Sequence, residues 1–161
     1  MEFTVNTKLD LSGFKEIEKA CKVLSKTVEV GILHNAEEAR IGKLQHDGGV
    51  GYFYYGPFEG QPVGVPPRPF LAHAMEHNGK HILETSAENL KEFNEGSAKE
   101  TLKEVGEMSV TFVKDTIAHH SRELNPDAPY NWGRTVITKG FDLPLNDKGN
   151  LRESIEYEVV E

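Results

Sequence analysis

The chain has 161 residues, and 26 acidic against 18 basic side chains give it a formal charge of −8. This length predicts a single domain over 1–161, because domains cluster at roughly 100–150 residues. The acidic balance argues against a surface that grips nucleic acid, since phosphates are held by clustered Lys and Arg. No apolar run approaches the roughly 18 residues of a membrane-spanning helix, and the first residues lack the pattern of a signal peptide.

The N-terminal part predicts a helix, a strand and a second helix. Apolar residues recur there at three- and four-residue spacings: Phe14, Ile17, Cys21 and Leu24. These spacings predict an amphipathic helix over 11–24. Cys21 is the chain's one cysteine, so no internal disulfide can form, and we expect it to be a small core residue. Alternation over 27–32 predicts a half-buried strand, and 36–45 has the pattern of a short helix.

The stretch 47–70 is predicted to be a projecting loop or arm. It is rich in Gly, Pro and aromatic residues, and its prolines fix φ and remove backbone donors, so it cannot be a central strand. Long loops that carry aromatic residues commonly make contacts. We therefore predict that ten of its residues form an oligomer or partner interface: Tyr52, Phe53, Tyr54, Tyr55, Phe58, Pro66, Pro67, Arg68, Pro69 and Phe70. Two of them have equal alternatives: Phe70 as a buried residue that begins a helix, and Arg68 as a partner of a local carboxylate.

The rest of the chain predicts helices followed by a final strand. Residues 71–122 form a helical segment, which we expect Asn78-Gly79 and Gly96-Ser97 to interrupt. Residues 143–161 predict a turn and a terminal strand over 154–160. The whole pattern predicts an α+β fold. A small twisted antiparallel or mixed sheet would pack against two or three helices, with the long Gly/Pro/aromatic loop outside them.

One motif has the spacing of a metal site. His73, Glu76 and His77 place two imidazoles one helical turn apart with a glutamate between them, which is typical of zinc-dependent hydrolases. His81 cannot complete the site, because along a straight helix it lies about 12 Å from His73. No distant carboxylate stands out as a third ligand. We therefore predict no catalytic residue, no metal and no cofactor, and keep a zinc-dependent hydrolase as the alternative of another class.

Two segments taken together suggest a family. The first is VPPRPFL at 65–71, which enters a helical stretch, and the second is LPLNDKGNLRESI at 143–155, just before the last strand. In this order and separation they resemble the neck or tail-completion proteins of tailed double-stranded DNA phages. That family has a P-x-R-P-F entry into a helix and a late P-L-x-D-T-G-x-L-x-x-S-I element. Lys148 stands here where the family usually has Thr, and Asn146 where it has an apolar residue.

The resemblance implies a structural virion protein and not an enzyme. Six or twelve copies would form a homo-oligomeric ring in the neck or tail of the virion, after assembly in the host cytoplasm. The ring would join the head connector or stopper protein to the tail terminator or tail tube protein. DNA would pass through its lumen without sequence-specific binding, and an acidic lumen would let it slide. The alternative within the same particle is the tail terminator, a ring subunit that caps the tail tube.

Overall fold

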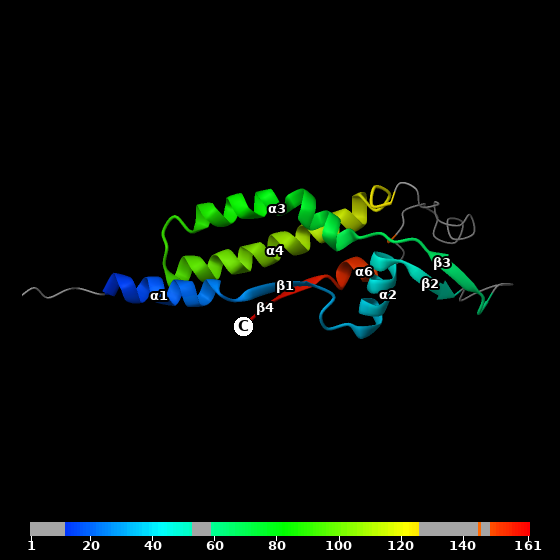
Figure 1. Ribbon diagram of the computed structural model, residues 1–161, viewed down its shortest axis with the longest axis horizontal. Helices are drawn as coiled ribbons and strands as arrows, with labels where there is room; N and C mark the ends of the chain where they lie inside the picture. Colours follow the sequence, from blue (N-terminus) through cyan, green and yellow to red (C-terminus); the bar gives the residue numbers. More distant parts are fainter. Residues whose placement is uncertain (1–11, 53–58, 126–144, 146–148) are drawn as a thin grey trace, which may run out of the picture.

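The structure is a computed structural model that describes residues 12–52, 59–125, 145 and 149–161. Its described elements are helices and short strands (Figure 1). In chain order they are α1 (Ser12–Leu24), β1 (Thr27–Gly31), α2 (Ala36–Asp47), β2 (Gly49–Tyr52), β3 (Pro62–Val65), α3 (Phe70–Asn89), α4 (Glu95–His119), α6 (Asn150–Glu153) and β4 (Glu156–Val160). The strands pair antiparallel, β1 with β4 and β2 with β3, so the predicted α+β class is confirmed.

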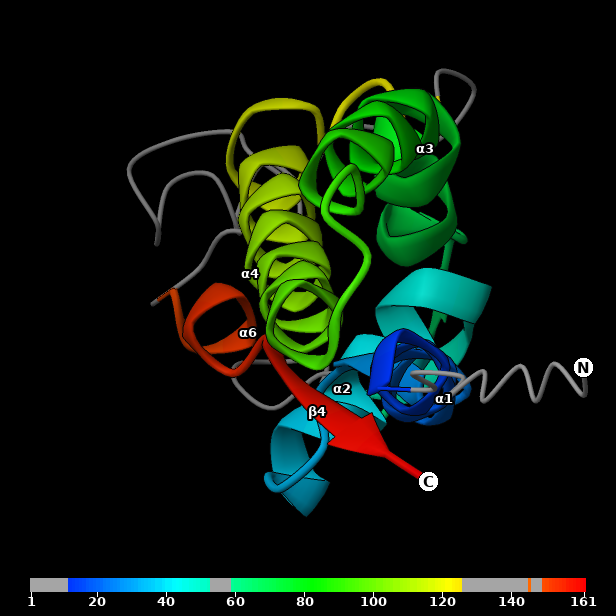
Figure 2. The same ribbon diagram turned by 90° about the vertical axis from the view of Figure 1, so that its left-hand side faces the viewer.

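The two longest helices, α3 and α4, lie side by side as an antiparallel pair (Figures 1 and 2). A capping box begins α4. The side chain of Asn94 accepts a hydrogen bond from the Ser97 N–H at 3.0 Å, and Ser97 Oγ accepts one from the Asn94 N–H at 3.1 Å. Neither these helices nor any other described helix combines the length and apolar character needed to cross a bilayer.

Of the two helix breaks predicted from the sequence, the one at Asn78-Gly79 is wrong, and the one at Gly96-Ser97 is placed a few residues too late. Helix α3 continues through Asn78 and Gly79, while Gly96 and Ser97 lie in the first turn of α4. A glycine inside a helix costs about 0.5–1 kcal/mol relative to alanine. Packing of α3 along α4 offsets this cost, because tertiary contacts supply most of a helix's stability in a protein. The break falls instead at 90–94, between the two helices.

The sheet of β1 and β4 packs against α4. Thr27 pairs with Val160 at one end of the strands, and Gly31 pairs with Glu156 at the other. Tyr157 lies over a glycine of α4: a Cβ at Gly106 would come within 2.1–2.5 Å of three carbons of the tyrosine ring. The absence of a side chain at Gly106 therefore sets how closely β4 approaches α4. The predicted terminal strand is confirmed, beginning at Glu156.

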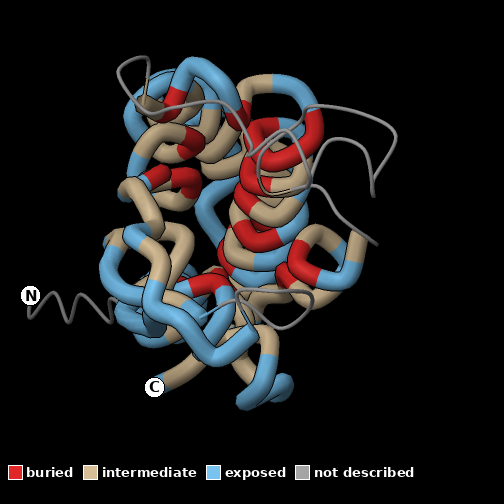
Figure 3. The backbone as a smooth tube through the Cα atoms, turned by 90° about the vertical axis from the view of Figure 1, so that its right-hand side faces the viewer, coloured by how far each residue is buried: buried red, intermediate tan, exposed pale blue. Residues whose placement is uncertain are grey.

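The core lies where the start of α3, the second half of α4, and α6 meet; Figure 3 shows the buried stretches along α4. Its buried members are Phe70, Ala74, Val113, Ile117, Leu124, Leu151 and Ile155. A Cβ on Gly42 of α2 would lie 3.2 Å from Leu151 Cδ1 and 3.9 Å from Phe70 Cζ. The two segments that carry the sequence resemblance are far apart in the chain, yet their apolar residues meet in one core.

The apolar face predicted for α1 is only partly covered. Ala20 is fully buried where α1 lies against α4, but Phe14 is 69% exposed and Ile17 is 47% exposed. Cys21 is also exposed, so the prediction that it is a core residue is wrong. Helix α4 covers only part of the apolar face of α1, and the rest of that face is exposed to solvent.

Candidate functional site

The hairpin of β2 and β3 has an inner face that packs on α2. Gly51 is paired with Val63, and because side chains alternate along a strand, Val65 shares their face. A Cβ at Gly51 would lie 3.2 Å from Val65 Cγ2 and 3.7 Å from Cδ2 of Leu44 on α2. Because this position of β2 is a glycine, the hairpin lies close to α2, and the inner face of the hairpin packs on Leu44.

The outer face of the same hairpin is apolar and open to solvent. Val50 is 62% exposed and Tyr52 is 58% exposed. Their partners across the hairpin are Gly64 and Pro62, which are also exposed and carry no charge. Adjacent apolar side chains on an exposed, supported ribbon are typical of a protein contact surface. We call these four residues the outer hairpin face.

The hairpin is held firmly at its base. Gly48 has a φ of 75°, and a Cβ there would lie 2.8 Å from the nitrogen of Pro67 and 2.9 Å from the carbonyl oxygen of Val65, so only glycine fits. The Arg68 N–H donates to the Gln45 carbonyl of α2 at 2.8 Å. The strand that leaves the hairpin is thus tied back to α2, and the outer hairpin face is presented by a braced support.

The structure buries two of the predicted contact residues, Phe70 and Arg68. Phe70 is 1% exposed in the core and Arg68 is 7% exposed. Both side chains are covered by their own chain, which leaves little of either one exposed for contact with a neighbouring subunit. The alternative considered for Phe70, a buried residue that begins a helix, is the one observed.

The structure does not test the other predicted contact residues, which remain predictions. Tyr52 and Pro67 are exposed, and Pro66 and Pro69 are half-buried. The others lie outside the described residues: Phe53, Tyr54, Tyr55 and Phe58. Of the ten positions, Tyr52 is thus the one whose aromatic side chain is described and open to solvent.

A cavity of about 220 Å³ opens beside α2. Its apolar lining comes from α2, from the residue after β1 and from the start of α3: Ile32, Ala39, Phe70 and Leu71. Lys43, His46 and Asp47 supply its polar side. Lys43 Nζ lies 2.7 Å from Asp47 Oδ2, and His46 Nδ1 lies 2.8 Å from Oδ1. Hydrogen bonds from Lys43 and His46 hold the pKa of Asp47 below its ordinary value.

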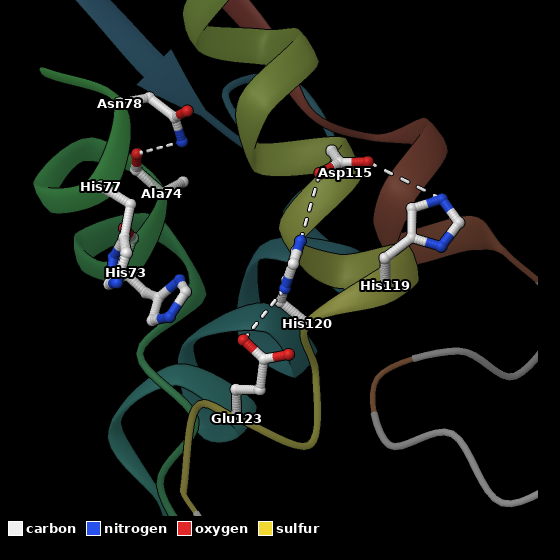
Figure 4. A network of polar contacts seen from close by, with 8 residues as sticks. All are labelled: His73, Ala74, His77, Asn78, Asp115, His119, His120 and Glu123. Carbon is white, nitrogen blue, oxygen red and sulfur yellow. Dashed lines mark hydrogen bonds and ion pairs between the residues drawn. The ribbon is translucent and has the colours of Figure 1, made fainter.

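The two histidines of the motif that has the spacing of a zinc site lie in a cluster between α3 and the end of α4 (Figure 4). The rings of His73 and His77 stack with centroids 4.0 Å apart, and His77 Nδ1 donates to the His73 carbonyl at 2.9 Å. His120 faces them, with its Nδ1 at 3.0 Å from Glu123 Oε2. Glu76 is exposed. Within the described residues no three His, Cys, Asp or Glu side chains are arranged to hold a metal ion.

This cluster predicts a pH-dependent stability. Burial lowers the pKa of His73 below the ordinary value of 6.5, and the nearby His77 and His120 lower it further. His73 is therefore protonated more readily in the unfolded chain than in the folded chain. The free energy of unfolding is highest above about pH 6.5 and falls as the pH drops below that value. We expect His73→Gln to flatten this fall, as measured by thermal unfolding at about pH 7.5 and 5.5. The exposed His81, changed to Gln, is the control. An unchanged pH slope in His73→Gln would contradict the assignment.

Sequence reasoning named Tyr52 as a candidate contact residue but did not name Val50 or the cavity. The alternation of glycine with larger residues over 49–52 is the signal that a one-sided strand leaves, and it could have identified Val50. The cavity has no local signal, because Ile32, Ala39 and Leu71 come from separate elements.

Comparison of the chain with protein-family profiles, with curated proteins and with solved structures finds no significant match.

Proposed function

We propose that this chain is a structural subunit of the head–tail junction of a tailed phage. Several copies form a ring that joins the head connector to the tail and lets DNA pass. The proposal starts from the resemblance of residues 65–71 and 143–155 to neck and tail-completion proteins. The structural feature that supports the proposal is the outer hairpin face, where Val50 and Tyr52 form an exposed apolar surface on a braced hairpin. Such a surface suits contact between subunits.

The small strand pairs also favour assembly. Within the described residues each strand has a single hydrogen-bonded neighbour, so each leaves one edge of backbone donors and acceptors for another partner. A monomeric protein usually protects such edges. A ring subunit can instead complete them, and its exposed apolar residues, against its neighbours.

The charge of the chain suits a channel for DNA. On the outer side of the β1–β4 sheet, Glu29 lies directly opposite Glu158, and Glu156 follows on the same face with its Oε1 2.8 Å from His34 Nδ1. Like charges placed opposite each other are unfavourable unless they stay solvated. A solvated acidic face would repel phosphates and let DNA slide, which agrees with the net charge of −8.

Binding to phage parts tests this function. The purified chain is mixed separately with DNA-filled heads and with isolated tails of the phage that encodes it, and each mixture is separated on a density gradient. We expect the chain to travel with the heads and to allow tails to join them. Co-sedimentation with tails alone would favour the tail terminator. A chain that travels with neither part, and is absent from assembled particles, would contradict a role at the junction.

A further inference from the structure

We propose that the outer hairpin face of one copy occupies the cavity beside α2 of the next copy, and that this head-to-tail contact builds the assembly. The inference rests on the proposed function and specifies its subunit contact. It names a second copy of this chain as the occupant of the cavity. Val50 and Tyr52 are the inserted side chains, and Ile32, Ala39 and Leu71 form the apolar wall that receives them.

The size and chemistry of the cavity favour a protein side chain. Its volume of about 220 Å³ is below the roughly 300–1,000 Å³ of small-molecule pockets. The lining is apolar with a polar side at His46 and Asp47. A tyrosine has this same division, because its ring is apolar and its hydroxyl seeks a hydrogen-bond partner at the edge of a buried site. Tyr52 of a neighbouring copy therefore matches the cavity in both size and polarity.

The conformation of the hairpin favours its insertion into the cavity of another copy. Val50 and Tyr52 are two residues apart on one strand face, so their side chains stand roughly 7 Å apart and point the same way. Gly64 lies opposite Val50 and has open space around its Cβ position. The support from Leu44 means that little conformational entropy is lost when the hairpin binds, which favours affinity.

Charges near the two surfaces are complementary in part. Glu59 is the one charged residue in the described part of the hairpin segment 49–65, and it is exposed. Lys43 lines the cavity with its Nζ 2.7 Å from Asp47 Oδ2, and the exposed Arg40 lies one turn before it on α2. A hairpin entering the cavity of another copy brings Glu59 toward Arg40, whereas Lys43 is already paired with Asp47.

The apolar part of the cavity on α2 and the contact that supports the hairpin lie on different sides of this helix. Ala39 lines the cavity, whereas Leu44 supports the hairpin. At about 100° per residue, these two positions point roughly 140° apart around the helix. A contact between unlike surfaces of identical copies is heterologous, and repetition of such a contact closes a ring when the rotation permits.

A pair of complementary variants tests the contact. The hairpin variant carries Val50→Ser and Tyr52→Ser, and the cavity variant carries Ala39→Phe, which fills the space. Leu83→Ser removes an equally exposed apolar residue from α3 and is the matched control. Circular dichroism confirms that each variant is folded, and Ala39→Leu replaces Ala39→Phe if the larger side chain disturbs the fold. Masses are measured by sedimentation velocity for the chain alone, or on phage heads if the wild type assembles only there.

We expect each variant alone to associate at least about tenfold more weakly than the wild type, with the control unchanged. A mixture of the two variants should form a two-chain species and nothing larger, because it contains one intact hairpin and one intact cavity. Assembly of the hairpin variant at wild-type strength would overturn the inference while leaving the proposed function standing. A wild-type chain that neither assembles nor binds heads and tails would contradict both.

Discussion

Replacing Phe70 with alanine is expected to lower the free energy of unfolding by about 3–5 kcal/mol. The side chain is 1% exposed and packs in the cluster that joins α3, α4 and α6, so its removal leaves a cavity as well as lost apolar contacts. This loss is a large part of the roughly 5–15 kcal/mol that stabilises a typical domain. Urea denaturation followed by circular dichroism measures it.

The matched control for this prediction is Leu83→Ala. Leu83 is on the same helix but 72% exposed, and its replacement is expected to change the unfolding free energy by no more than about 0.5 kcal/mol. A loss below about 1 kcal/mol for Phe70→Ala would contradict its burial. It would also restore Phe70 as a candidate for contact with another subunit.

Gly106→Ala is the second substitution with a large expected effect. Alanine normally stabilises a helix interior relative to glycine, but here a Cβ would come within 2.1–2.5 Å of the Tyr157 ring. The ring and β4 would have to move away from α4. We expect a net loss of about 1–3 kcal/mol in the free energy of unfolding, the usual cost of overpacking, measured by urea denaturation.

Gly79→Ala on α3 serves as the control for this substitution. It has no neighbouring atom within 4 Å of its Cβ position, so alanine should there raise the unfolding free energy by about 0.5–1 kcal/mol. Opposite signs for the two glycine substitutions would confirm the close packing of β4 on α4. Stabilisation by both would contradict it.

Local pattern predicted the kinds of elements better than their ends. The alternation at 27–32 and 154–160 predicted two strands, and the structure pairs them as β1 and β4. The sequence could not predict that α3 continues through Gly79, because tertiary packing on α4 decides this. Nor could it predict that Cys21 is exposed, since an apolar stripe does not reveal how much of it a neighbouring element covers.

The candidate interface could be predicted only in part. A Gly/Pro-rich stretch with aromatic residues pointed to 47–70, and Tyr52 is indeed exposed there. Composition could not predict which other residues of the stretch are buried: Phe70 and Arg68 are buried, whereas Val50 is exposed. The P-x-R-P-F pattern is therefore explained in this chain largely by packing. The contact surface that we propose lies in the hairpin that precedes it.

The proposal that this chain is a ring subunit is tested by the mass of the species that the purified chain forms as its concentration is raised. Sedimentation equilibrium of the wild-type chain, alone and with phage heads added, gives this mass. The subunit is 18.0 kDa, and a ring of six or twelve copies predicts the corresponding multiple of that mass. A species that remains at 18.0 kDa both alone and in the presence of heads would contradict the proposal that this chain is a ring subunit.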